Sequence, residues 1–170
     1  MPIVTRASAI AVTSAVTLAA LLYNGTAPAF ADPSDGVAVN GRYTAFSDGA
    51  WAKTNDRFHD EASTTSTWTI TSSCSTFYDC TGRVVSDAGW SGDLLYLSGR
   101  WRVSHEIPDW QRCPDGSTAP GTQAFTFAPP RADDVVVPKL VGLDSTTGPS
   151  GACGVNLWNN ITMPFTLTRL

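Results

Sequence analysis

The chain contains few charged residues. Only 15% of its 170 residues are Asp, Glu, Lys or Arg, and the 11 basic residues are outnumbered by 15 acidic ones. Nucleic-acid binding depends on clustered Lys and Arg that neutralise phosphates, so this composition argues against a nucleic-acid-binding protein. With 42% apolar and 10% aromatic residues, the composition also argues against intrinsic disorder. A chain of this length is expected to contain one folded domain.

A single charged residue, Arg6, precedes Asp32. It is followed by an apolar run over residues 7–23 and then by Ala29-Phe30-Ala31, which places small residues at the −3 and −1 positions of a cleavage site. This layout is typical of a secretory signal peptide. The alternative is a retained membrane anchor, for which the run is short.

We therefore expect residues 1–31 to be a signal peptide that is removed, and residues 32–170 to form a single all-β domain. No later apolar stretch approaches the roughly 18 residues of a membrane-spanning helix. The expected location is the cell envelope or the medium, with no stable membrane span after cleavage.

Cysteine is sparse, and the four residues form no Cys-x2-Cys pair of the kind typical of structural zinc sites. In an exported chain, four cysteines are expected to form two disulfides, for which three pairings are possible. We favour Cys74–Cys80, which encloses five residues, together with Cys113–Cys153, whose members both lie in turn sequences. The sequence suggests no metal ion or other cofactor.

No part of residues 32–170 shows a sustained helical period. Instead, apolar and β-branched residues alternate with hydroxyl residues over 65–72, which predicts a strand. The dipeptide Ser98-Gly99 predicts a tight hairpin, while the segment 51–58 is compatible with one helical turn or another strand. Further strands are predicted over 37–46, 81–86, 94–98, 100–107, 123–128, 135–143 and 161–170. Short antiparallel strands at this spacing predict a small antiparallel β-barrel or a β-sandwich with two disulfides.

Hydroxyl side chains are concentrated between Ser63 and Thr76, where 11 of 14 residues are Ser or Thr. This segment is typical of a strand with a hydroxyl face. Left unpaired at the edge of a sheet, such a strand would be prone to pairing with other chains.

Catalytic motifs are weak. Ser91 and Ser150 lie in Gly-x-Ser-Gly sequences that lack the full Gly-x-Ser-x-Gly pattern of serine hydrolases. A small hydrolase using His105, Glu106 and Asp109 is one possible reading of the acidic residues and histidines. We assign no catalytic residue and no metal ligand, and an enzymatic activity is not expected.

The six tryptophans are the most unusual feature of the composition. Trp68 and Trp101 lie in alternating segments and are predicted to be core residues. The other four, Trp51, Trp90, Trp110 and Trp158, lie near turns or strand ends and are the candidate ligand-binding residues, because an exposed indole combines a flat apolar face with one polar group. The alternative is that these tryptophans fill the ends of a β-domain.

Several motifs resemble small secreted proteins of mycobacteria and related actinobacteria. The resemblance includes 51–55, 66–70, the cysteine turns 113–116 and 148–154, and 163–168. It extends over nearly all of residues 32–170. It implies export and a shared fold, and it assigns no activity or site residue.

Three functions therefore remain open. The first is an exported, non-catalytic β-domain that binds an unknown ligand or envelope component through aromatic loop residues. The second is a small cell-envelope hydrolase that uses Asp, Glu or His. The third is a secreted structural or antigen-like protein without a small-molecule site.

Overall fold

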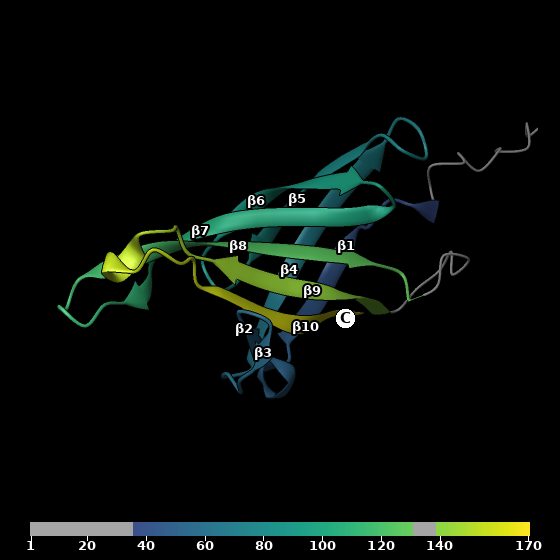
Figure 1. Ribbon diagram of the computed structural model, residues 1–170. Coiled ribbons are helices and arrows are strands. Elements are labelled where there is room, and N and C mark those ends of the chain that lie inside the picture. The colour runs from purple at the N-terminus through teal and green to yellow at the C-terminus, as the bar shows by residue number, and fades with distance from the viewer. Residues whose placement is uncertain (1–35, 131–138) are drawn as a thin grey trace, which may run out of the picture. The chain divides into compact units, whose positions relative to one another are not determined.

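The computed structural model describes residues 36–130 and 139–170, so the predicted signal peptide lies outside the described residues. Regular structure in the described part is almost entirely β-strand (Figure 1). None of its helices is long and apolar enough to cross a membrane. The elements are β1 (Gly41–Ser47), η2 (Gly49–Trp51), β2 (Lys53–Thr54), β3 (Arg57–Phe58), β4 (Thr64–Cys74), β5 (Cys80–Ser86), β6 (Ser91–Leu97), β7 (Arg100–Arg112), β8 (Thr118–Ala128), β9 (Lys139–Thr147), η3 (Ala152–Gly154) and β10 (Asn160–Arg169), where η denotes a short 3-10 turn.

Eight antiparallel strands form a closed barrel. From β4 to β10 each strand pairs with the next one in the sequence, and β1 pairs with both β4 and β10. In the closing pair, Tyr43 lies opposite Arg169 and Ser47 lies opposite Phe165. Of the two architectures predicted from the sequence, the structure is therefore the barrel.

Closure determines the environment of the hydroxyl-rich segment. Most of this segment forms β4, which pairs with β1 on one side and with β5 on the other. Its backbone groups are therefore occupied within the barrel, and β4 is not an edge strand.

Alternate residues of each strand point into the barrel and form its core. Trp68 and Trp101 are each 1% exposed, which confirms that they are core residues. The ring of Trp68 meets that of Phe125 edge to face, with centroids 4.8 Å apart and planes at 86°, a favourable arrangement for aromatic rings. Other completely or almost completely buried side chains are Ile70, Val84, Leu94, Val103, Phe127, Phe165 and Leu167.

The predicted hairpin between β6 and β7 is confirmed. Ser98 and Gly99 connect the strands with φ values of 51° and 81°, both in the left-handed region that a two-residue type I′ turn requires. The segment 51–58 contains both expected alternatives, because η2 ends at Trp51 and the short pair β2–β3 follows and attaches to β10.

Several strand boundaries differ from the predicted ones. Strands β7 and β8 are longer than the predicted ranges 100–107 and 123–128, because they continue to pair beyond an irregularity between Ile107 and Gln111. Strand β9 extends beyond the predicted range 135–143, because its hydroxyl-rich second half pairs with both β8 and β10. Residues 135–138 of that range lie outside the described residues.

Both favoured disulfides are confirmed. Cys74 and Cys80 are directly opposite each other where β4 and β5 pair, with Cα atoms 4.0 Å apart. Cys113 lies in the turn between β7 and β8, and its partner Cys153 lies in η3. The second bridge therefore joins the tip of the β7–β8 hairpin to the connection between β9 and β10, on the left of Figure 1.

The two disulfides should contribute unequally to stability. Their members are 40 residues apart in Cys113–Cys153 and 6 apart in Cys74–Cys80. Loss of loop closure predicts a decrease in the free energy of unfolding of about 4 kcal/mol when Cys113 and Cys153 are both changed to Ser, and of about 2 kcal/mol for the other pair. Denaturant unfolding of the two double variants measures this, and a larger loss for the Cys74–Cys80 pair would contradict the expectation.

Candidate ligand-binding site

A cavity of about 510 Å³ lies at the barrel end where β1 ends and β4 begins; we call it the end cavity. Its walls come from most strands of the barrel and from the turn between β5 and β6. The lining combines aromatic and aliphatic side chains with a few polar groups, as is typical of ligand sites. The lining includes Ser47, Trp68, Trp90, His105, Glu106, Ile107, Trp110, Gln123, Phe125, Met163 and Phe165.

Trp90 covers one wall of the end cavity. Its ring is stacked on the imidazole of His105, with centroids 4.1 Å apart and planes at 11°, and is nearly parallel to Phe125 at 5.8 Å. The rings of Trp68 and Trp90 are nearly perpendicular, with centroids 5.2 Å apart and planes at 84°. The tight β5–β6 turn positions this indole, since the backbone N–H of Ser86 donates to the carbonyl of Trp90 at 3.0 Å.

A chain of hydrogen bonds runs through the polar part of the wall. Ser47 Oγ donates to Asp144 Oδ2 at 2.7 Å, and Gln123 Nε2 donates to both carboxyl oxygens of Asp144 at 2.9 Å. The other end of the Gln123 amide, Oε1, is 3.0 Å from Nε2 of His105. Because Oε1 can only accept, this contact assigns a proton to Nε2 of His105.

Asp144 is completely buried, with 0% exposure. Burial raises the pKa of this carboxyl above its ordinary value, while hydrogen bonds from Ser47 and Gln123 and the charge of His105 act in the opposite direction. All the hydrogen bonds that hold Asp144 come from groups that also line or adjoin the end cavity. The carboxyl of Asp144 therefore fixes the positions of Ser47 and Gln123 in the cavity wall.

Trp110 lies within the irregularity in the pairing of β7 with β8, directly before pairing resumes at Gln111. Its indole packs where a side chain at Gly121 would be, because a Cβ there would lie 2.7 Å from Cδ2 of Trp110. A Cβ at Gly148 would lie 3.0 Å from Cζ3 of the same ring. Two glycines thus make room for the indole beside the end cavity.

The four candidate tryptophans do not lie together. Trp90 and Trp110 both line the end cavity and are half-buried. Trp158 is 62% exposed and lines a separate depression beside Asn55 and Asn160. Trp51 is 63% exposed and lies edge-on to Phe58.

The residues considered for a hydrolase are not arranged as a catalytic triad. His105 contacts the Gln123 amide and the backbone carbonyl of Glu106, while the carboxylate of Asp109 accepts a hydrogen bond from Thr118. Across residues 36–130 and 139–170, no Ser or Thr hydroxyl or Cys thiol is hydrogen-bonded to His105. The same residues contain no cluster of three or more His, Cys, Asp or Glu that could hold a metal ion.

The sequence did not identify the polar groups Ser47, Gln123 and Asp144. For Asp144 the signal was the alternation of β9, in which Leu140, Asp144 and Thr146 are buried. The predicted strand ends at residue 143, one residue short of Asp144, so the alternation was not extended to this side chain.

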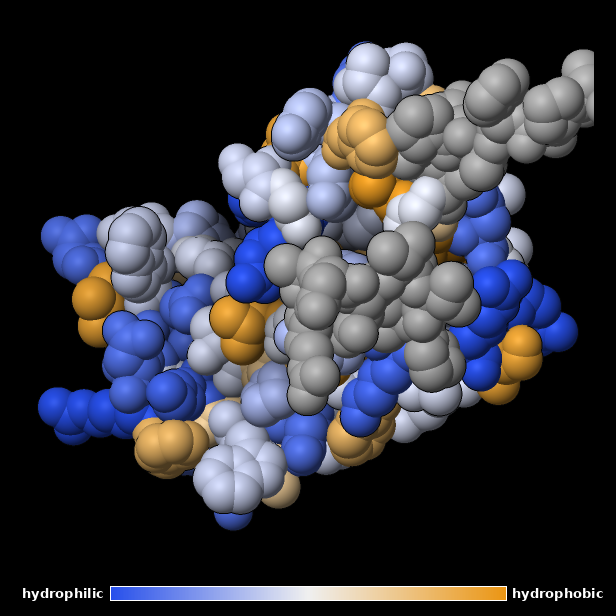
Figure 2. All heavy atoms as spheres, turned by 90° about the vertical axis from the view of Figure 1, so that its right-hand side faces the viewer, coloured by the Kyte–Doolittle hydropathy of each residue, from blue (hydrophilic) through white to orange (hydrophobic). Residues whose placement is uncertain are grey.

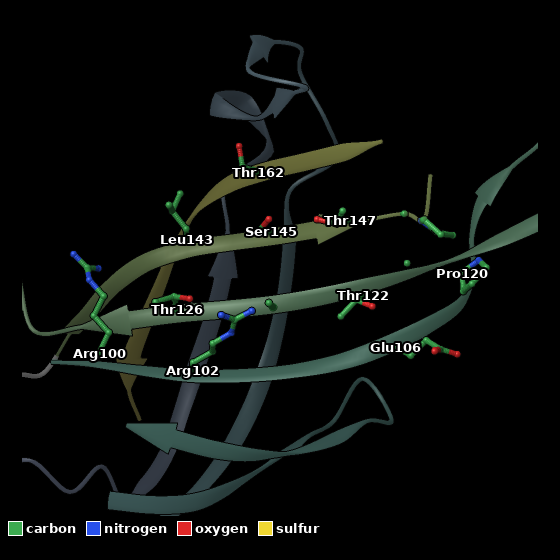
Figure 3. A pocket seen from close by; sticks show the side chains of 14 residues that line it. Arg100, Arg102, Glu106, Pro120, Thr122, Thr126, Leu143, Ser145, Thr147 and Thr162 are labelled. Atoms are coloured by element: carbon green, nitrogen blue, oxygen red, sulfur yellow. The ribbon is translucent and has the colours of Figure 1, made fainter. Parts of the chain in front are cut away.

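A second, larger depression lies on the outer surface of β7 to β10 (Figure 3). Its volume is about 870 Å³, and its floor carries hydroxyl side chains such as Thr126 and Ser145. Arg100 and Arg102 lie at one end and Glu106 at the other. None of its polar side chains is buried and none of its lining residues is aromatic, so the end cavity is the better candidate for a ligand site.

The face on the right of Figure 1, away from the Cys113–Cys153 bridge, is shown in Figure 2. On the described residues of that face, apolar groups are separated by hydrophilic ones. This view therefore shows no continuous apolar patch on the described residues that would compete with the end cavity as a binding site.

No protein-family model matches the chain, and no curated protein matches it by sequence. Among solved structures, the barrel is similar to the monomer form of the M. tuberculosis PknI sensor domain, with a TM-score of 0.56 and 15% sequence identity. The alignment covers 78% of this chain and 88% of that domain. At this identity the likeness concerns the fold, and it shows that a mycobacterial domain has a similar fold.

The buried carboxyl predicts a specific pH dependence. A raised pKa means that folded Asp144 holds its proton more tightly than the unfolded chain does, so its contribution to stability is full below about pH 3.8 and is lost as the pH rises through the raised pKa. In the Asp144→Asn variant, the amide at this position does not titrate. The free energy of unfolding of the wild type, minus that of the variant, should therefore fall as the pH rises above about 3.8 and then level off.

Denaturant unfolding of both proteins between about pH 3 and pH 8 measures this difference. The other titrating groups are shared by the two proteins, and those that do not interact with Asp144 cancel in the subtraction; His105, whose charge acts on Asp144, is the exception. A difference that rises with pH, or that stays constant, would show that burial does not raise the pKa of Asp144.

Packing of Trp110 on Gly121 can be tested with a double-mutant cycle. Gly121→Ala places a methyl group against the indole, which must move, and we expect a loss of about 1–3 kcal/mol. In a Trp110→Ala background the same substitution meets no indole and should cost much less. Equal costs in both backgrounds would show that the indole does not pack on Gly121.

Proposed function

We propose that the chain is an exported, non-catalytic β-barrel domain that binds a small ligand in the end cavity. The observation that carries this proposal is that one barrel end combines an aromatic wall with a chain of hydrogen-bonded polar side chains. Trp90 is held against His105, which is connected through Gln123 to the buried carboxyl of Asp144. Such rigid positioning of side chains around a cavity is typical of a binding site.

Export is supported by two features. Both pairs of cysteines form disulfides, which persist in oxidising compartments. The N-terminal sequence, with Arg6, the apolar run and Ala29-Phe30-Ala31, is typical of a signal peptide. The motifs that resemble secreted actinobacterial proteins favour the same location, at the cell envelope or in the medium.

A role in sensing is supported by the likeness to the PknI sensor domain, since that domain has a similar fold and is described as a sensor. The non-catalytic part of the proposal is supported by the hydrogen bonds of His105, which are made to an amide and to a backbone carbonyl. Serine catalysis would instead need a nucleophile beside the imidazole.

The proposal predicts that ligand binding depends on two of the four candidate tryptophans. Soluble peptidoglycan fragments, a neutral polysaccharide and a monoacylglycerol are titrated while tryptophan fluorescence is recorded. For a probe that binds, Trp90→Ala and Trp110→Ala should each weaken affinity by at least about tenfold, because each removes aromatic area from the cavity wall. Trp51→Ala and Trp158→Ala are matched controls that should bind as the wild type does, because neither residue lines this cavity.

Three results would contradict the proposal. Absence of binding by all three probes would favour a structural role without a small-molecule site. Equal loss of affinity in all four variants would place the ligand outside the end cavity. Turnover of ester or glycoside substrates that disappears in Glu106→Gln would instead favour a hydrolase.

A further inference from the structure

We infer that the ligand of the end cavity is an uncharged amphiphile, an apolar chain that carries an oxygen acceptor, as in an acyl ester. This inference rests on the proposed function, because it names the ligand class of the same cavity. Three properties of the cavity wall lead to it: its free indole N–H groups, its lack of available charge and its apolar surface.

The indole N–H groups divide the tryptophans into two kinds. In the core, Trp68 Nε1 donates to Ser66 Oγ at 3.0 Å and Trp101 Nε1 donates to the carbonyl of Val37 at 3.2 Å. Trp90 and Trp110 line the end cavity and, like the exposed Trp51 and Trp158, have no hydrogen-bond acceptor for Nε1 within the described part of the chain. A ligand that displaces water from these groups must supply acceptors, or it leaves two donors unsatisfied.

The packing of Trp110 leaves the N–H edge of its indole free of the glycines. Its Cε3 and Cζ3 atoms face Gly148, where an added Cβ would lie 3.5 and 3.0 Å from them, and Nε1 is on the opposite edge of the indole. The polar edge of the ring is therefore turned away from the glycine packing.

Charge in the wall is not available to a ligand. No Lys or Arg lines the end cavity, so an anionic ligand would meet His105 as its sole basic group, and Nε2 of that residue already donates to Gln123. A cationic ligand would find no free carboxylate inside, because both oxygens of Asp144 are occupied and this side chain is completely buried. Glu106 also lines the end cavity, but along β7 it alternates with the inward-facing Val103 and His105, and its exposed carboxylate lies at the outer depression (Figure 3). An ion would lose its hydration in the cavity without gaining a partner, so an uncharged ligand is favoured.

The rest of the wall is apolar. Phe125, Phe165, Met163 and Ile107 lie beside Trp68 around the same space. Met has a flexible, polarisable side chain that adapts to the shape of a ligand. An apolar chain next to these residues, with its ester oxygens toward the two indole N–H groups, satisfies both parts of the wall.

The test follows the six indole N–H signals by NMR in the ¹⁵N-labelled protein, assigned with single Trp→Phe variants. A medium-chain monoacylglycerol is titrated below its micelle concentration. The signals of Trp90 and Trp110 should move downfield and exchange more slowly with solvent as they gain an acceptor. Those of Trp68 and Trp101 already have acceptors and should show no such slowing, while those of Trp51 and Trp158 should not change.

Charge selectivity is measured with the fatty acid and the primary alkylamine of the same chain length, and both should bind at least about tenfold more weakly than the ester. Trp90→Phe and Trp110→Phe should each weaken ester binding by about three- to tenfold, as expected for the loss of one hydrogen bond. Equal affinity for either charged analogue, or ester binding that leaves both indole signals unmoved, would overturn the inference. A glycan that shifts the Trp90 and Trp110 signals while the ester does not would also overturn it and leave the proposed function intact, whereas no response to any probe would contradict the proposed function itself.

Discussion

The pairing of β1 with β10 is the constraint on which the rest of the structure depends. It joins the first and last strands of the barrel, so that no strand of the barrel has a free edge and every second side chain is enclosed. The enclosed volume has to be filled by side chains or remain as a cavity. Around Trp68 and Trp101 the aromatic residues fill it, whereas at the end near Ser47 and Gln123 a space remains.

The hydrogen bonds that join Ser47, Asp144, Gln123 and His105 explain how a carboxyl group can be buried inside this barrel. An isolated buried carboxyl would be strongly destabilising, but Asp144 receives hydrogen bonds at both oxygens. Each member of the chain also restricts the next: Asp144 orients the Gln123 amide, and the amide orients the imidazole of His105. The benefit is a wall of defined geometry, in which the imidazole of His105 supports the ring of Trp90.

Local patterns in the sequence predicted the local features of the fold. Alternation over residues 65–72 was sufficient to assign Trp68 to the core, and the turn chemistry of Ser98-Gly99 predicted the β6–β7 hairpin. The barrel itself depends on contacts between the two ends of the described chain, which no local pattern records.

The candidate site was predicted only in part, for the same reason. Exposure of a tryptophan in a turn depends on how that turn packs, so the sequence could not separate Trp90 and Trp110 from Trp51 and Trp158. Asp144 was missed because a boundary error of a few residues hides the orientation of a side chain in a strand.

The Cys113–Cys153 bridge has a consequence for local opening of the barrel. The chain segment between its two cysteines contains the whole of β8 and β9, so these strands are enclosed in one covalent loop. A transient separation of β8 or β9 from the barrel is therefore tethered at the end that carries Trp110, and it has to begin at the opposite end. The bridge thus makes the barrel end that contains the end cavity the last part to open.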